Sequence, residues 1–350
     1  MTTPNQQKKP KILFVCKKRH DSYGVSVGLI NSARFIANLL NQHGVESKVV
    51  MVRDANFIDS EVYEYKPTHV IIEALWVTPA KMEELVRIYQ RRRRHVKWIV
   101  RIHSKAAFIA NEGVAMDWIS AYKWRLTTHY KNFFVSSNNA EFNAELNEVF
   151  DLHSVYLPNI YLPTPHDLGQ PHNLDSNVIH IGCFGAVRPL KNHLLQAISA
   201  IKFGNDINKA IYFHINADRV EQGGDNVIKN LRGLFRHQRH KLIEHPWATH
   251  QDFIKMLQGI DIGMQVSLSE SFNIVSGDMV SSQIPVVVSD EINWVPFIFR
   301  ANPMDGEEIV SVLKFVYFTK WTGLYRINEL FLKWSNFKNG RIWLGFIHQP

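Results

Sequence analysis

The chain has 350 residues, of which 45% are hydrophobic and 21% charged, and it carries a formal net charge of +8. The length favours two domains, and the composition is that of a folded globular protein without low-complexity segments. No stretch approaches the ~18 consecutive apolar residues of a membrane helix, so we expect no integral membrane segment. The positive charge favours anionic partners such as nucleotides, nucleic acid or acidic membranes, without selecting one of them.

The N-terminus and the cysteines indicate the cellular compartment. The polar, basic residues 1–11 lead directly into an apolar run, which is unlike a signal peptide. Cys16 and Cys183 lie in separate apolar runs, and the sequence has no Cys-x-x-Cys. We therefore expect two reduced core cysteines in a cytoplasmic protein.

Short apolar runs alternate with helical patterns in the first half of the chain. The predicted strands are residues 11–16, 47–52, 68–74, 96–103, 131–137 and 153–159. The apolar spacing after residue 27, ended by Gly44, predicts the first helix. Apolar strands that alternate with helices indicate a parallel sheet covered on both faces.

Four prolines between residues 158 and 171 interrupt this pattern, without helical or alternating periodicity. Such a segment is typical of a linker. We therefore expect a first Rossmann-like domain over residues 1–160 and a Pro-rich linker over 161–176.

The strand-and-helix pattern then restarts. Predicted strands are residues 177–185, 210–216, 241–246, 260–266 and 284–289, and residues 190–202 read as a helix. We expect a second Rossmann-like domain over 177–302 and a helical segment over 303–350. Two such α/β halves would face each other across a cleft, with functional residues just after the strand ends.

The stretch SLSESFNIVSGD, residues 267–278, follows one of these strands. Glu270 lies in the loop, and the N–H groups of Asn273, Ile274 and Val275 begin a helix, where phosphate is attracted. Asp278 lies about one turn further along this helix, where its carboxylate can accept hydrogen bonds from two hydroxyls of a ribose. Taken alone, two solvated acids at a helix start are the simpler interpretation.

Three other strand ends carry candidate residues. Arg188 and Lys191, in GAVRPLKN, can face one point and suit a diphosphate, or they are surface cations in a turn. Gly24 lies at the turn between the first strand and helix, where glycine lets a ligand approach the backbone. His103 ends a strand, where a structural role is the simpler interpretation. No Gly-x-Gly-x-x-Gly and no phosphate loop is present at this turn.

Together these pieces resemble the retaining nucleotide-sugar glycosyltransferases of the two-domain GT-B fold. That family has Glu, seven residues, Glu, with Phe-Gly after the first acid and Gly-x-Pro-Val-Val after the second. Here Glu270 and Asp278 have this spacing, Phe272 is retained and residues 285–287 are Pro-Val-Val, while Asn273 replaces the glycine. The resemblance implies that Glu270 contacts the donor sugar and Asp278 holds the ribose.

The resemblance extends to the other candidates. Lys191 matches the family's diphosphate-binding lysine, whereas Ala186 stands at the usual arginine position, and Arg188 is the nearby replacement. His103 resembles the family's histidine that contacts the donor sugar. Pro158-Asn159 resembles the Pro-Asn that ends the first domain, to which a terminal helix in this fold often returns.

The resemblance implies a metal-independent transfer with retention from a nucleotide sugar, by default a UDP-sugar, to an acceptor hydroxyl. The nucleotide sugar would bind in the domain of residues 177–302 and the acceptor in that of residues 1–160. The sequence has no Asp-x-Asp, and we expect no obligatory metal or cofactor. The chain also resembles compact glycosyltransferases of bacterial DNA viruses (phages), which makes a modified base in DNA one acceptor and a glycan another. A non-catalytic binding protein and a sugar-nucleotide epimerase or hydrolase are the alternatives.

The densest positive run is RRRR at residues 91–94. A solvated helix end is its simpler interpretation, and a docking patch for an anionic acceptor is the alternative.

Overall fold

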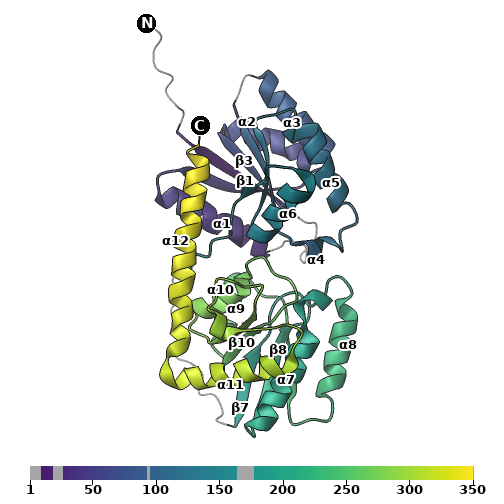
Figure 1. Cartoon of the computed structure of the whole chain (residues 1–350), viewed down its shortest axis with the longest axis vertical. Coiled ribbons are helices and arrows are strands. Elements are labelled where there is room, and N and C mark those ends of the chain that lie inside the picture. The colour runs from purple at the N-terminus through teal and green to yellow at the C-terminus, as the bar shows by residue number, and fades with distance from the viewer. Residues whose placement is uncertain (1–8, 19–26, 93–94, 164–176, 350) are drawn as a thin grey trace. The chain divides into compact units, whose positions relative to one another are not determined.

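The structure is a computed structural model that describes residues 9–18, 27–92, 95–163 and 177–349. The chain divides into two compact units (Figure 1). The first unit comprises Met1–Leu162 and Asn336–Pro350, and the second comprises Pro163–Ser335.

The first unit contains a sheet of six strands in the order β2-β1-β3-β4-β5-β6, and all neighbours are parallel. The strands are β1 (Lys11–Lys17), β2 (Glu46–Val52), β3 (His69–Glu73), β4 (Lys97–Ile102), β5 (Phe133–Ser137) and β6 (Val155–Tyr156). Each overlaps a predicted strand. The parallel α/β class is therefore confirmed for this unit.

Helices connect these strands. They are α1 (Val27–Gln42), η1 (Ala55–Phe57), α2 (Ile58–Tyr65), α3 (Pro79–Arg91), α4 (Ala106–Ile109), α5 (Ala115–Tyr122), η2 (Lys123–Thr127) and α6 (Ala140–Phe150). Two of these helices begin with an N-cap side chain. Thr78 and Asn139 accept hydrogen bonds from first-turn N–H groups of α3 and α6, respectively.

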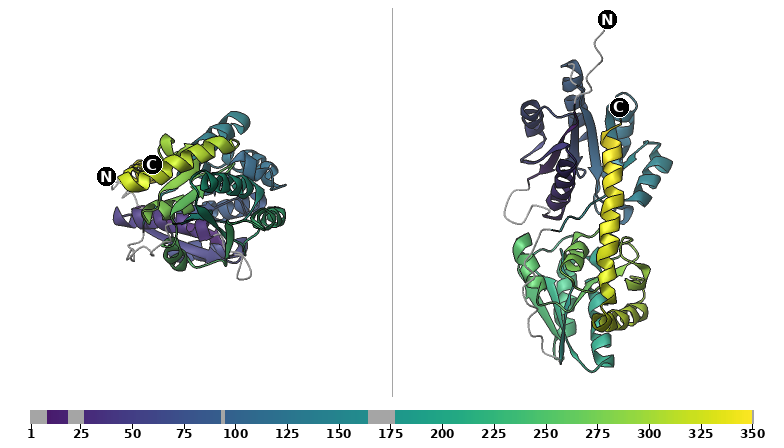
Figure 2. Two further views of the ribbon diagram at one scale, coloured as in Figure 1. Left: turned by 90° about the horizontal axis from the view of Figure 1, so that it is seen from below. Right: turned by 90° about the vertical axis from the view of Figure 1, so that its left-hand side faces the viewer.

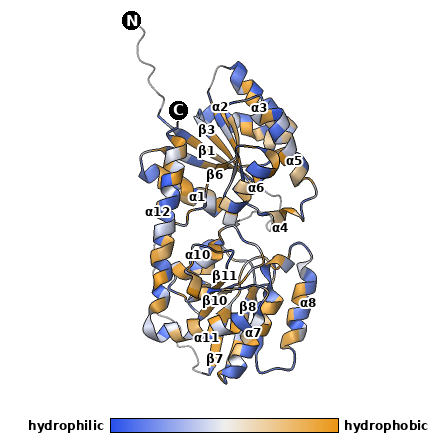
Figure 3. Ribbon diagram, in the orientation of Figure 1, coloured by the Kyte–Doolittle hydropathy of each residue, from blue (hydrophilic) through white to orange (hydrophobic). Residues whose placement is uncertain are grey.

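Both faces of this sheet are covered. Leu13 and Val15 of β1 belong to one hydrophobic cluster, and the alternate residues Ile12 and Phe14 belong to another. Successive side chains of a strand point to opposite faces, so an apolar run with no polar alternation needs a core on each side. Figure 3 shows this hydrophobic character in the strands of both sheets.

The second unit repeats the plan with strands in the order β12-β11-β10-β7-β8-β9, again all parallel. The strands are β7 (Val178–Gly182), β8 (Ala210–Asn216), β9 (Lys241–His245), β10 (Ile262–Gln265), β11 (Val286–Ser289) and β12 (Arg300–Ala301). Sequence analysis identified the first five. It missed β12, because two residues are too few to show a period.

The helical elements of the second unit follow its strands. They are η3 (Pro189–Lys191), α7 (His193–Asp206), α8 (Gly224–Phe235), α9 (His250–Leu257), α10 (Ile274–Ser281), η4 (Phe297–Phe299), α11 (Gly306–Thr322), η5 (Leu324–Arg326) and the start of α12 (Ile327–Ile347).

The helix α12, yellow in Figure 2, begins in the second unit and ends in the first. Its C-terminal half completes the core of the first unit. Trp343 is fully buried, packs against the ring of Phe14 and donates its Nε1–H to the carbonyl oxygen of Pro158 at 2.8 Å. The Asn339 side chain donates to the carbonyl oxygen of Asn159 at 2.9 Å.

Candidate functional site

Two loops at the carboxyl ends of β7 and β10 meet in the second unit. Lys191, 9% exposed, lies in the first loop and forms an ion pair with Glu270 of the second loop. Gly185 of the first loop has a φ of +118°, a conformation that favours glycine, and a Cβ there would lie in ordinary contact with the lysine, 3.7 Å from Lys191 Cε. The structure therefore brings these two predicted residues together.

A second carboxylate lies at this pair. The backbone N–H of Glu270 donates to Glu291 Oε2 at 3.0 Å, and Glu291 follows β11. Sequence analysis missed Glu291, although its position just after a predicted strand was an available signal. A buried ion pair adds little net stability, because desolvation offsets the attraction. A pair of this kind at the ligand-binding edge of a parallel sheet therefore favours a binding role.

Arg188 engages a different acid. Its Nη1 lies 3.3 Å from Glu221 Oε2, and Arg219 Nε donates to the other oxygen at 2.7 Å. Burial acts to raise the pKa of Glu221, but Arg219 and Arg188 together hold that pKa below its ordinary value. Arg188 and Lys191 thus contact separate carboxylates in this structure, and their shared binding of a diphosphate stays a prediction.

Asn273 provides the N-cap of α10, which Ile274 and Val275 begin. Its Oδ1 accepts from the backbone N–H of Ser276 at 2.9 Å, and its Nδ2 donates to Gln265 Oε1 at 2.9 Å. The backbone φ of Asn273 is +63°, in the left-handed region. Asparagine enters this region more readily than most residues, which explains how it stands where the resembled family has glycine.

Asp278 and Phe272 are buried on either side of this cap. Asp278, 2% exposed, accepts a hydrogen bond of 2.7 Å from His250 Nε2, and this bond raises the pKa of His250. Phe272 stacks on Trp294 with ring centroids 5.7 Å apart, and its carbonyl oxygen accepts from the Trp294 Nε1–H. Phe272 thus packs the loop in this structure. Sequence analysis missed His250 and Trp294, which belong to no motif.

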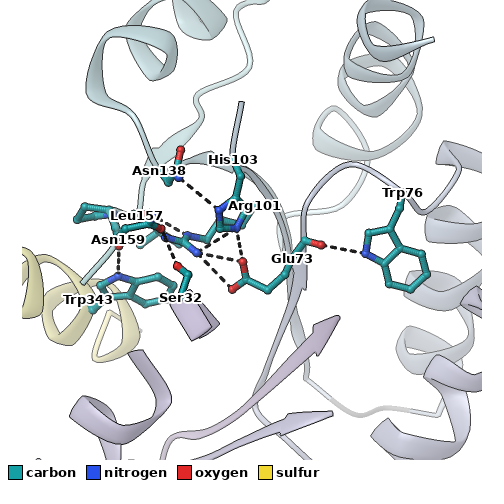
Figure 4. Close-up of polar contacts among 10 residues, drawn as sticks. Ser32, Glu73, Trp76, Arg101, His103, Asn138, Leu157, Asn159 and Trp343 are labelled. Carbon is teal, nitrogen blue, oxygen red and sulfur yellow. Dashed lines mark hydrogen bonds and ion pairs between the residues drawn. The ribbon is translucent and has the colours of Figure 1, made fainter. Parts of the chain in front are cut away.

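In the first unit, His103 lies beside two fully buried charges (Figure 4). Arg101 Nη1 is 3.0 Å from Glu73 Oε2, and His103 Nε2 contacts the same oxygen. Glu73 ends β3 and Arg101 lies in β4. Sequence analysis identified His103 alone, because the two charges stand within strand-like runs.

The remaining groups of Arg101 are also bonded. Its Nε donates to the carbonyl oxygen of Leu157 at 2.9 Å and its Nη2 to Asn159 Oδ1 at 2.5 Å (Figure 4). Ser32 Oγ donates to the same Asn159 oxygen at 2.8 Å, which connects the network to α1. Asn159, of the Pro-Asn pair, therefore organises the buried arginine.

The electrostatics assign a protonation state to this network. Burial and the adjacent Arg101 lower the pKa of His103, against the opposing effect of Glu73. Burial acts to raise the pKa of Glu73, but Arg101 and His103 bring it below its ordinary value. We infer an ionised Glu73 and a neutral His103 at neutral pH. His103 Nδ1 lies 3.3 Å from Asn138 Nδ2 on the other side of the ring.

Some predictions fall outside these arrangements. Gly24 lies outside the described residues. Across the described ranges, no cluster of three or more His, Cys, Asp or Glu side chains is arranged to hold a metal ion. No helix among them is long and apolar enough to cross a membrane. Cys16 and Cys183 are both buried thiols, and burial raises the pKa of Cys183 to about 12.

Comparison with known proteins finds similarity of structure only. No model of a protein family matches the chain, and no curated protein matches it. A structure of trehalose-6-phosphate synthase (OtsA) is similar with a TM-score of 0.67 and 9% identity, covering 97% of this chain and 99% of that one. A glycosyltransferase from Rickettsia africae is similar with a TM-score of 0.62 and 15% identity, over 97% and 98% of the two chains.

A third similar structure is an alpha,alpha-trehalose-phosphate synthase (UDP-forming) from Burkholderia xenovorans in complex with glucose-6-phosphate. It has a TM-score of 0.60 and 11% identity, over 84% of this chain and 76% of that one. At these identities the similarity shows the fold, which is the predicted GT-B class of two parallel-sheet α/β units.

Proposed function

We propose that the chain is a glycosyltransferase that moves a sugar from a nucleotide sugar to an acceptor hydroxyl, with retention and without an obligatory metal. The largely buried pair of Lys191 and Glu270, at the carboxyl ends of β7 and β10, is the observation that carries this proposal. The GT-B fold supports it by analogy, because many proteins of this fold transfer sugars.

The donor is proposed to bind in the second unit. A diphosphate would replace Glu270 as the partner of Lys191, with the amides of Ile274 and Val275 at the start of α10. Glu270, released from the lysine, would then contact the donor sugar. Asp278 would accept ribose hydroxyls, and its hydrogen bond from His250 orients the carboxylate for this role.

Catalysis is proposed to be electrostatic. Departure with retention passes through a cationic, oxocarbenium-like sugar while the diphosphate gains negative charge. Lys191 and the α10 amides would stabilise that leaving group, and losing one such contact typically lowers the rate by about 10²–10³. Arg188 would join them if a ligand drew it from Glu221. His103 remains the proposed sugar contact of the first unit.

A UDP-sugar is the proposed donor, and a sugar or sugar phosphate is the proposed acceptor. The similar structures support both, since one is of a UDP-forming synthase in complex with glucose-6-phosphate. Nothing in those structures favours a modified base in DNA as the acceptor. An acceptor screen should include such DNA for comparison with sugars and sugar phosphates.

Donor binding is tested by thermal unfolding with UDP-, GDP- and ADP-sugars. A ligand at ~100 times its dissociation constant should add ~2.7 kcal/mol to the free energy of unfolding. Lys191→Ala should abolish this effect. The control is Lys202→Ala, which removes an exposed lysine that pairs with Glu307 on the surface. The donor site is wrong if no nucleotide sugar stabilises the wild type, or if Lys191→Ala responds equally.

Turnover is tested by the release of nucleoside diphosphate with and without acceptors, in the presence of a chelator. Release that requires a sugar acceptor supports the transferase, and the anomeric configuration of the product tests retention. Release without an acceptor indicates a hydrolase. Donor binding without any product indicates a non-catalytic binding protein.

A further inference from the structure

The helix α12 carries hydrophobic side chains on its solvent-facing side as well as on its buried side. Leu330, Trp334 and Phe337 follow the spacing that places residues on one face of a helix, and they are 64%, 62% and 65% exposed. Leu332 and Trp343, on the opposite face, are 2% and 0% exposed. Large apolar side chains are normally confined to the buried face of a helix, so those on the outward face of α12 call for a covering surface.

Exposed hydrophobic side chains concentrate in this part of the chain. Of the seventeen large exposed ones in the described residues, seven lie within residues 318–337. These are Phe318, Trp321, Leu324, Leu330, Phe331, Trp334 and Phe337. They occupy the end of α11, the turn η5 and the first half of α12, all coloured yellow in Figure 1. Such a concentration of exposed apolar side chains in one part of the chain is typical of an interaction site.

The charges around this face are mainly positive. Three basic residues of α12 (Lys333, Lys338 and Arg341) are exposed, and Glu329 is the only acid in the helix. Lys333 pairs with Glu329 at 2.6 Å. The guanidinium of Arg341 lies 5.9 Å from the ring centre of Phe337, so a cation and an aromatic share one surface.

We propose that the outward face of α12 docks on an anionic lipid surface. Interfacial helices combine Trp, Phe and Leu with Lys or Arg, so that the rings enter the headgroup region while the cations contact lipid phosphates. Each basic residue near such a surface adds favourable energy, and the excess of cations matches this requirement. The proposal is independent of the proposed sugar transfer.

A second copy of the chain is a poorer fit to this face. A two-fold symmetric contact would place each patch against its own equivalent. The net positive charge of one patch would then face the net positive charge of the other, and like charges across an interface are unfavourable. An anionic membrane carries the complementary charge instead.

Vesicle flotation of the full-length chain tests the proposal. We expect binding to vesicles of phosphatidylcholine mixed with phosphatidylglycerol, and much weaker binding to phosphatidylcholine alone. Raising the salt to about 1 M, where the Debye length falls to about 3 Å, should weaken the anionic binding.

The aromatic side chains are tested by the double variant Trp334→Ala/Phe337→Ala. Both side chains are exposed, so the fold should be retained, which circular dichroism checks. The partition coefficient should fall roughly 10-fold, because two apolar side chains no longer enter the membrane. The control Trp124→Ala/Phe57→Ala removes exposed rings elsewhere and should bind as wild type does.

The charges are tested by Lys338→Glu/Arg341→Glu. Binding to anionic vesicles should fall at least roughly 10-fold, and binding to neutral vesicles should not change. The control Lys229→Glu/Arg236→Glu makes the same charge change at exposed residues of α8 and its C-cap. Equal losses in both variants would show that only the net charge matters, which contradicts a specific docking face.

Two further results would overturn the proposal. The first is absence of wild-type binding to either kind of vesicle. The second is a wild-type dimer, measured by light scattering, that Trp334→Ala/Phe337→Ala converts to a monomer, because the face would then be a contact between copies.

Discussion

Arg101 is a charged side chain without exposed surface, and the structure surrounds it with acceptors. Glu73 supplies the opposite charge, and Leu157 and Asn159 accept hydrogen bonds from other N–H groups of Arg101. A buried guanidinium whose partners are all present costs little, whereas one that has lost its counter-charge is strongly destabilising. Replacing a single residue of this network can therefore lower the stability of the protein strongly.

We predict that Glu73→Gln lowers the free energy of unfolding by about 3–5 kcal/mol, because Arg101 becomes an unpaired buried charge. Urea unfolding measures the change. The matched control is Asp59→Asn, which breaks the exposed pair with Arg92 and should cost at most ~1 kcal/mol. Equal effects of the two substitutions would contradict a fully buried ion pair.

Three histidines of the second unit form a chain of ring contacts around His214, which is buried. His214 lies between His180 and His245, with ring nitrogens 2.9 and 2.7 Å apart. Burial, together with His245 and His180, lowers the pKa of His214 to about 3. The ring is therefore neutral in the folded protein over most of the acidic range.

This pKa predicts loss of stability in acid. Below about pH 6.5 the unfolded chain protonates His214 and the folded chain does not, so the unfolded state binds more protons and gains stability as the pH falls. The contribution of this one group approaches 1.4 kcal/mol per pH unit, by the linkage relation, down to about pH 3.

The free energy of unfolding, measured by urea between about pH 7 and 4, checks this slope. His214→Gln should flatten it, whereas His153→Gln, at an exposed side chain, should keep the wild-type slope. An unchanged slope in His214→Gln would place the acid sensitivity elsewhere.

At the scale of elements, α8 starts where two backbones approach closely. A Cβ on Gly224 would lie 2.0 Å from the carbonyl oxygen of Val187, in the loop after β7. Gly233 lies in the same helix with nothing within 4 Å of its virtual Cβ. Close packing against the backbone therefore requires glycine at position 224, whereas position 233 has room for a side chain.

We predict that Gly224→Ala destabilises the protein by about 1–3 kcal/mol, because backbone atoms must move to admit the methyl group. Gly233→Ala should stabilise it by up to about 1 kcal/mol, because alanine favours helix. Urea unfolding of both variants measures the contrast. A loss of stability in both would mean that helix α8 tolerates no side chain at either glycine.

At the scale of the whole molecule, the first unit is built from two separate parts of the chain. Residues 336–350 supply Trp343, Phe346 and Ile347 to the core that includes β1. The first unit therefore cannot complete its core until residues 336–350 have been synthesised. The second unit is continuous in sequence.

We predict that Trp343→Ala lowers the stability of the first unit by about 3–5 kcal/mol. Hydrogen exchange resolved by peptide suits a protein with two units, and exchange should rise in β1, β3 and β4 but not in β7, β8 and β10. Trp334→Ala, in the exposed half of the same helix, should change stability by less than about 0.5 kcal/mol. Equal exchange in the two variants would contradict this account of α12.

The amino-acid sequence alone determined the fold class and the approximate position of eleven of the twelve strands found in the described residues. Apolar runs, prolines and helix caps are local signals, and a sheet buried on both faces leaves continuous apolar runs. Motif spacing also selected Lys191 and Glu270, which the structure joins as an ion pair although 79 residues separate them.

Only the tertiary structure decided which side chains meet. The strand β7 lies beside β10 in the sheet, so the loop with Lys191 faces Glu270, and no periodicity reveals that neighbour. Burial likewise turns Arg101 and Glu73 from ordinary strand residues into the centre of a network. Pairing and burial depend on contacts between distant segments, because an interaction energy depends on distance in space and on the surrounding solvent.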